Sequence, residues 1–97
     1  MKGELNMERM IHEDKGRLYM GEKQDPAAEL VFDVEDDTMI ILSTHVDPDE
    51  REQGLGRELV DEAVNYARKH KLMIDPVCSF AHNVIEETPE YQVVRKK

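Results

Sequence analysis

The sequence has little that would support a cross-linked, metal-bound or membrane-embedded protein. It holds one cysteine, Cys78, which excludes an internal disulfide and a cysteine-based zinc site. No apolar run approaches the roughly 20 residues that a membrane-crossing helix needs, and the first residues lack the apolar stretch of a secretory signal. His12, His70 and His82 show no metal-ligand spacing. We therefore expect a cytoplasmic protein that holds no metal and contacts no membrane.

Basic residues are also scarce. The chain has 13 Lys and Arg against 22 Asp and Glu, which gives a formal net charge of -9. Binding to nucleic acid needs clustered Lys and Arg that neutralise phosphates, and the only such cluster here is Arg95-Lys96-Lys97. We expect no nucleic-acid partner. The acidic surface favours cationic partners, or it serves solubility alone.

The residues that are present are sufficient for one globular domain. Hydrophobic residues make up 39% of the 97 positions, and charges of both signs are spread along the chain. A chain of this length buries only about two thirds of its unfolded surface, so two independent cores are not expected. We predict a single domain over residues 1–97, present as a monomer or a weak homodimer.

The first half of the chain predicts strands arranged as two hairpins. Their expected ranges are 5–12 and 17–20 for the first hairpin, and 29–34 and 38–46 for the second. Gly16 supplies a positive φ in the first turn, and Gln24-Asp25-Pro26 forms the break between the two hairpins. The run Met39-Ile40-Ile41-Leu42 is continuously apolar, which predicts a fully buried central strand.

The second half changes to a helical period. From Leu55 onward, apolar residues fall on one stripe of a helix, and charged residues occupy the other face. Residues 72–78 then predict a short strand, and Phe80, Val84 and Ile85 mark a short second helix that ends before Pro89. The predicted fold class is α+β, with a mostly antiparallel sheet, a main helix after the fourth strand and a short C-terminal helix.

Two glycines at the start of the main helix raise a question, because glycine near a helix start costs roughly 1 kcal/mol relative to alanine. Gly54 and Gly56 follow Arg51 and precede Arg57. The spacing fits neither a P-loop, which needs Lys and Ser or Thr after the second glycine, nor the dinucleotide fingerprint, which needs a small residue at Leu59. Two interpretations stay open: an anion site at the helix start, or close packing of the helix on the sheet.

The loop Arg51-Glu52-Gln53-Gly54-Leu55-Gly56 resembles the acyl-CoA pyrophosphate loop R/Q-x-x-G-x-G/A of the GNAT superfamily of N-acetyltransferases. Order and position match as well, because the loop follows the central strand and opens the main helix. More narrowly, "VDPDEREQGLGRELVDEAVNYARKHKL", "PVCSFAHNVIEE" and "PEY" resemble the small, minimal GNAT-like proteins. The resemblance covers residues 17–91.

The resemblance implies an N-acetyltransferase that passes an acetyl group from acetyl-CoA to an amine, on a small molecule or a protein. It implies that the backbone near Val46 holds the pantetheine arm. It also implies a set of residues around the CoA pyrophosphate: Arg51, Gln53, Gly54, Leu55, Gly56 and Arg57.

Cys78 is the remaining candidate for chemistry. A single cysteine that closes an apolar stretch is typical of buried packing. However, Cys78-Ser79-Phe80 matches the C-[SP]-[FY] motif of the small GNAT-like proteins, which implies a thiol near the acyl thioester. It could act as a base, as a proton donor to the departing thiolate or as an acyl acceptor.

The sequence departs from the pattern of the small GNAT-like proteins at the position of a histidine. Many relatives read His-Thr-x-Val at the end of the fourth strand, whereas this chain reads Ser43-Thr44-His45-Val46. Two positions shift a side chain by roughly 7 Å along a strand, so we expect His45 to be a partly exposed residue and not the catalytic base.

Two further features keep a second function open. Acidic residues crowd the proposed anion loop, and only residues 13–16 separate the first two strands, where longer GNAT enzymes place acceptor-groove helices. The alternative is a non-catalytic acyl-CoA-binding or protein-interaction module on the same fold.

Overall fold

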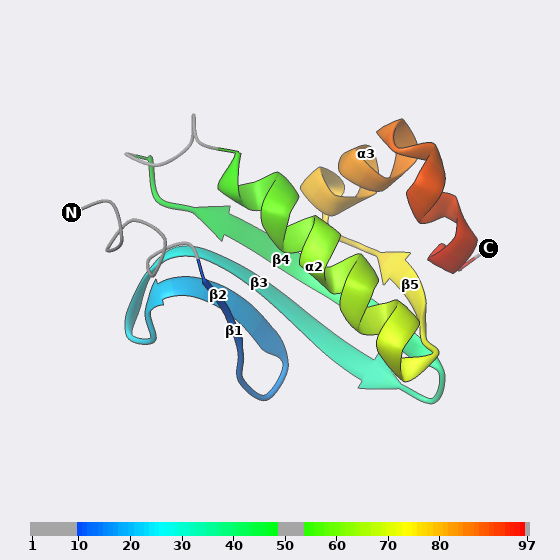
Figure 1. Ribbon diagram of the computed structural model, residues 1–97, viewed down its shortest axis with the longest axis horizontal. Helices are drawn as coiled ribbons and strands as arrows, with labels where there is room; N and C mark the ends of the chain where they lie inside the picture. Colours follow the sequence, from blue (N-terminus) through cyan, green and yellow to red (C-terminus); the bar gives the residue numbers. More distant parts are fainter. Residues whose placement is uncertain (1–9, 49–53, 97) are drawn as a thin grey trace.

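The computed structural model describes residues 10–48 and 54–96. A five-stranded sheet has the order β1-β2-β3-β4-β5, in which the first four strands are antiparallel neighbours and β5 lies parallel to β4. The strands are β1 (Ile11–Glu13), β2 (Arg17–Glu22), β3 (Asp25–Glu35), β4 (Thr38–Val46) and β5 (Met73–Pro76). The helices are α2 (Leu55–His70), α3 (Ser79–Glu87) and the 3-10 helix η2 (Pro89–Val94) (Figure 1). The predicted α+β class and the mostly antiparallel sheet are confirmed.

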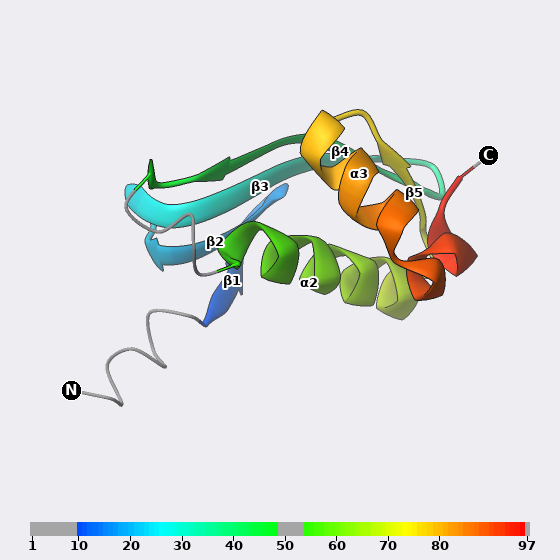
Figure 2. The ribbon, with the colours of Figure 1, turned by 90° about the horizontal axis from the view of Figure 1, so that it is seen from above.

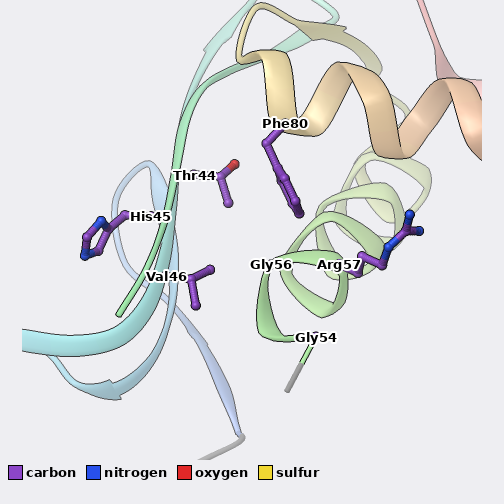
Figure 3. Close-up of a pocket in the computed structure, with 7 residues that line it drawn as sticks. All are labelled: Thr44, His45, Val46, Gly54, Gly56, Arg57 and Phe80. Carbon is purple, nitrogen blue, oxygen red and sulfur yellow. The ribbon is translucent and has the colours of Figure 1, made fainter. Parts of the chain in front are cut away.

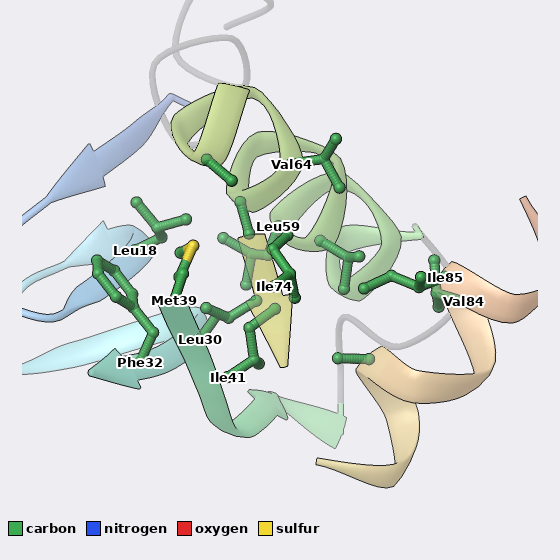
Figure 4. Close-up of a cluster of buried hydrophobic side chains, with 14 of the residues drawn as sticks. Leu18, Leu30, Phe32, Met39, Ile41, Leu59, Val64, Ile74, Val84 and Ile85 are labelled. Carbon is green, nitrogen blue, oxygen red and sulfur yellow. The ribbon is translucent and has the colours of Figure 1, made fainter. Parts of the chain in front are cut away.

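The molecule has two layers, with α2 and α3 on the same face of the sheet (Figures 1 and 2). Alternate residues of β3 explain this arrangement, because Ala28, Leu30 and Phe32 are buried toward the helices while their neighbours are more exposed. Leu59 and Val64 of α2 and Ile74 of β5 join the same core (Figure 4). Among the described residues, no helix has the length and apolar content that crossing a membrane requires.

Helix α2 forms because its apolar stripe matches the helical period. The predicted stripe is buried from Leu55 to Ala67, and removal of this surface from water is the main favourable term in its packing. Basic residues of the last turn suit the negative end of the helix dipole. Lys71 then ends the helix in the left-handed conformation, with φ of 59°, and Leu72 N–H donates to the Ala67 carbonyl.

A β-bulge in β4 decides which side chains face the helices. Phe32 pairs with Ile41 and Val31 pairs with Ser43, so Leu42 is the extra residue in the ladder. Met39 and Ile41 are buried, whereas Ile40 is half-buried and Leu42 is 48% exposed. The expectation of a fully buried strand over residues 39–42 was therefore wrong, because α2 and α3 cover only one face of the sheet (Figure 2) and the bulge changes the alternation.

The boundaries of the other strands and turns agree only in part with those predicted from the sequence. The first strand is described over Ile11–Glu13, and residues 5–9 of its predicted range lie outside the described residues. Gly16 has the expected positive φ of 92°. The expected break at residues 24–26 is shorter than predicted, because Asp25 and Pro26 already pair with β2. The chain also forms η2 after Pro89, which the sequence pattern did not predict.

Candidate functional site

A pocket of about 420 Å³ lies where the end of β4, the start of α2 and the start of α3 meet (Figure 3). This volume is within the range of small-molecule sites in proteins, about 300–1,000 Å³. The pocket is lined by Thr44, His45, Val46, Gly54, Gly56, Arg57 and Phe80.

The pocket exists because β4 and β5 separate. Their parallel pairing ends at Ile41 and Pro76, and a last backbone bond joins Cys78 N–H to the Ile41 carbonyl at 3.0 Å. From there β5 leads into α3, while β4 continues to Val46. In the described part of the chain, no strand pairs with residues 42–46 on the side away from β3. That edge of β4 is left to face the pocket.

The free edge of β4 presents backbone groups to the pocket. The Thr44 N–H is directed at the Cys78 sulfur, whereas the Asp47 N–H donates to the Ala27 carbonyl on the β3 side. Because backbone N–H groups of a strand point alternately to its two sides, the Val46 N–H points the same way as that of Thr44. The backbone N–H of Val46 therefore points to the side of β4 away from β3, where the pocket lies.

Gly54 is the N-cap of α2 and has a φ of 71°, a left-handed conformation that favours glycine. Among the described residues, a Cβ built on Gly54 would have no heavy atom within 4 Å. The backbone at this position is therefore open, and the start of α2 places the positive end of the helix dipole beside it.

Gly56 has a different reason to be glycine. A Cβ there would lie 2.8 Å from Phe80 Cζ and 3.4 Å from Val46 Cγ2. Real Cβ atoms essentially never make the first of these contacts, so the Phe80 ring occupies the space that a side chain at Gly56 would fill. Of the two interpretations of the glycines, close packing explains Gly56, whereas the open backbone at Gly54 is compatible with an anion site.

Cys78 is the N-cap of α3 and is half-buried next to the pocket. Its Sγ lies 3.5 Å from Thr44 Oγ1. The Cys78 thiol donates to Thr44 Oγ1. Burial raises the pKa of the thiol, but hydrogen bonds to the thiolate from the Thr44 side chain and from the backbone N–H groups of Ala81, Phe80 and Thr44 outweigh burial. The pKa of Cys78 is therefore lowered from its ordinary value, which favours the reactive thiolate.

His45 and Arg57 are directed away from the centre of the pocket. Paired residues on neighbouring strands share a face, so Thr44, opposite buried Leu30, faces the helices, whereas His45, opposite Glu29, faces the other side of the sheet (Figure 3). His45 is exposed, as expected. The Arg57 guanidinium forms an exposed ion pair with Glu87 of α3.

The structure brings most of the sequence-predicted site residues together. Val46, Gly54, Gly56 and Arg57 line the pocket, and Cys78 adjoins it through Thr44. Leu55 directs its side chain into the core, where it is 3% exposed, so only its backbone could meet a ligand. Arg51 and Gln53 lie outside the described residues.

Sequence reasoning did not assign three of the pocket residues to the site: His45, which it weighed and set aside, and Thr44 and Phe80, which it did not consider. The latter two stand in the motifs that carried the resemblance, Ser43-Thr44-His45-Val46 and Cys78-Ser79-Phe80. Those motifs directed attention to the histidine and the cysteine, and not to the threonine and the phenylalanine that line the pocket. Among the described residues, no group of three or more His, Cys, Asp or Glu side chains could hold a metal ion.

Comparisons with known proteins agree with this geometry. Residues 17–94 match the family described as GCN5-related N-acetyl-transferase. A candidate GCN5-like N-acetyltransferase from Staphylococcus aureus, solved by NMR, shares 28% identity and a TM-score of 0.77, over 92% of this chain and 89% of its own.

A second solved structure shows the likeness of fold alone. The ribosomal-protein-S18-alanine N-acetyltransferase from Escherichia coli has a TM-score of 0.62 and 18% identity, over 89% of this chain and 68% of its own. No curated protein matches the chain.

Proposed function

Because the chain belongs to the GCN5-related N-acetyltransferase family, we propose that it transfers an acetyl group from acetyl-CoA to an amine. The observation that carries this proposal is the opening between β4 and α3, which has a free strand edge on one side and the Cys78 thiol at its end. Acetyl-CoA is the acyl donor that the family generally uses, and it would supply the acetyl group as a reactive thioester.

The residues present fit the two ends of such a donor. Gly54 leaves backbone exposed at the start of α2, where N–H groups and the helix dipole favour a phosphate. Val46 presents its backbone N–H and carbonyl along the free edge of β4, where the amides of the pantetheine arm would bind, while the Thr44 N–H is directed at Cys78. Arg57 adds a positive charge at the pocket wall, although its guanidinium is shared with Glu87.

Cys78 is proposed to move the proton that acetyl transfer releases. When the amine nitrogen bonds to the acetyl carbon and the carbon–sulfur bond breaks, one proton must leave the nitrogen and one must reach the departing sulfur. The Cys78 thiolate would accept the proton from the nitrogen and pass it to the departing CoA sulfur. Cys78 would then be a thiolate again, as at the start. Thr44 holds the thiolate through its hydroxyl and its N–H, and it acts as a positioning residue.

A second candidate function rests on the connection between β1 and β2. Only Asp14, Lys15 and Gly16 separate these strands, so no helix stands there to form an acceptor groove. A protein that binds acyl-CoA without an efficient acceptor site would have this architecture. The two candidates share the donor site and differ only in turnover.

Calorimetry and a turnover assay test the proposal in sequence. CoA and acetyl-CoA should release or absorb heat on binding, and no heat at millimolar CoA would remove the donor site. With binding established, steady release of free CoA in the presence of a panel of amines supports the enzyme. Binding without release for any amine supports the binding module.

The Cys78→Ala variant tests the assigned chemistry. A group that assists proton transfer typically contributes about 10²- to 10⁴-fold, so turnover should fall by about that range while CoA affinity changes little. Asn83→Ala, at an exposed position of the same helix, is the matched control. An acetyl adduct on Cys78, found by intact-protein mass spectrometry and removed by an amine, would instead indicate a two-step route. An unchanged rate in Cys78→Ala would exclude both roles.

A further inference from the structure

Phe80 differs from the other apolar residues of α3. Ala81, Val84 and Ile85 are buried in the core, whereas Phe80 remains 40% exposed. Its ring extends from the start of α3 into the space between β4 and α2 (Figure 3). The ring therefore lines the pocket and remains accessible to a ligand there.

The ring bridges the gap between the two walls of the pocket. The position that a Cβ of Gly56 would take lies 2.8 Å from Phe80 Cζ, 2.9 Å from Cε2 and 3.4 Å from Val46 Cγ2. The tip of the ring thus lies against the backbone of α2 at Gly56, and the Val46 side chain borders the same space. Glycine at position 56 is what permits this contact.

The ring also lies between the two ends of the proposed donor site. Gly54 is at one end of the pocket, and Thr44, in contact with Cys78, is at the other. An extended arm that joins phosphates at Gly54 to a thioester at Cys78 would follow the free edge of β4 past Val46. That path passes through the gap that the Phe80 ring occupies.

On the basis of the proposed function, we propose that Phe80 controls entry of the acyl-CoA arm, with its ring closed on Gly56 in the free protein and displaced when the arm binds. The ring has open solvent to turn into, because it is already 40% exposed. In the bound protein, the arm replaces the ring against Gly56 and Val46.

The expected effect is on the rate of association. A ligand that binds only the open form associates at a rate reduced by the open fraction. Partial burial of one aromatic ring can favour the closed form by about tenfold, or about 1.4 kcal/mol. Variants that keep the gap open should therefore bind CoA about tenfold faster.

Two variants open the gap to different extents. Phe80→Ala removes the ring, and Phe80→Leu replaces it with a shorter side chain that leaves part of the gap open. Val93→Ala, at a residue that is 67% exposed on η2, is the control. Association and dissociation rates for CoA are measured by surface plasmon resonance on folded, immobilised protein, with thermal melting as the check on folding.

Nuclear Overhauser contacts give a direct test that does not depend on the variants. In the free protein, Phe80 ring protons should show contacts to the Gly56 α-protons, and these contacts should disappear at saturating CoA. Contacts that persist in the saturated protein would overturn the proposal. Association rates of both variants equal to that of the unsubstituted protein would also overturn it. If the unsubstituted protein does not bind CoA, the proposed function fails first, and the role of Phe80 fails with it.

Discussion

Substitutions at Gly54 separate the conformational role of this glycine from its proposed contact with a ligand. Gly54 adopts a φ of 71°, which L-residues reach at a cost of about 1–2 kcal/mol. In the part of the chain that the structure describes, no heavy atom lies within 4 Å of the position that a Cβ on Gly54 would take. A side chain at position 54 therefore costs the energy of the left-handed backbone and clashes with none of the described residues.

The magnitudes follow from these two observations. Gly54→Ala should lower the free energy of unfolding by about 0.5–1 kcal/mol, because the cost of the left-handed conformation is partly offset by the lower entropy of the unfolded chain. Gly54→Val should cost more, about 2 kcal/mol, since β-branched residues rarely adopt a positive φ. Gly54→Asn should stay within about 0.5 kcal/mol, because asparagine tolerates this conformation and is a preferred N-cap.

The Gly54→Asn variant therefore tests CoA binding separately from the backbone conformation. It preserves the backbone but adds a side chain where the phosphates are proposed to approach. We expect CoA to bind Gly54→Asn at least about tenfold more weakly, which corresponds to about 1.4 kcal/mol. Lys71→Asn is the matched control, since Lys71 adopts the same conformation, with φ of 59°, at the opposite end of α2.

Urea denaturation gives the stabilities, and calorimetry gives the CoA affinities. If Gly54→Asn is as stable as the unsubstituted protein and binds CoA equally well, the glycine serves only the backbone conformation. That result would refute the assignment of the pyrophosphate to the start of α2.

Two further predictions concern side-chain ionisation. Thr44→Val removes the hydroxyl that helps to lower the pKa of Cys78, so the pH dependence of alkylation by iodoacetamide should move to higher pH, and Thr44→Ser should restore it. A profile that is identical in all three proteins would show that the hydroxyl does not act on the thiol. Burial, followed by the hydrogen bond to Asp61, raises the pKa of Tyr91 from 10.0 to about 12. Because the unfolded chain ionises at the lower value, this stabilisation is complete below pH 10 and should be lost between about pH 10 and pH 12. The difference in tyrosinate absorbance between the unsubstituted protein and Tyr91→Phe should show the high pKa, and an ordinary pKa in that difference would refute the contact.

Local patterns in the sequence were sufficient for most of the fold. The apolar stripe that begins at Leu55 predicted α2, since helical amphipathicity is a property of neighbouring residues. Gly16 marked a turn that needs positive φ, and Pro89 marked the end of α3. The sequence also predicted the family, because the Arg51 to Gly56 loop and the Cys78 motif are short, continuous stretches of residues that can be read without knowledge of the fold.

Other features depended on strand pairing, which no local pattern reveals. The bulge at Leu42 arises from the register between β3 and β4, and a shift of one residue reverses every later side chain. This register directs Thr44 toward the helices and His45 toward the open face of the sheet. The sequence shows an apolar run over residues 39–42, and only the paired strands show which of its members are buried.

The features of the site also fall into those that the sequence determines and those that only the tertiary structure shows. The sequence by itself determined that two glycines and a cysteine would stand at the start of α2 and α3, because residue order fixes which element each one opens. Only the tertiary structure decided that Gly54 is open and that Gly56 is covered by the Phe80 ring of another helix. It also decided that the Cys78 thiol meets Thr44. Contacts between distant residues depend on how β4 and α3 separate, and that separation is set by the packing of the whole sheet against its helices.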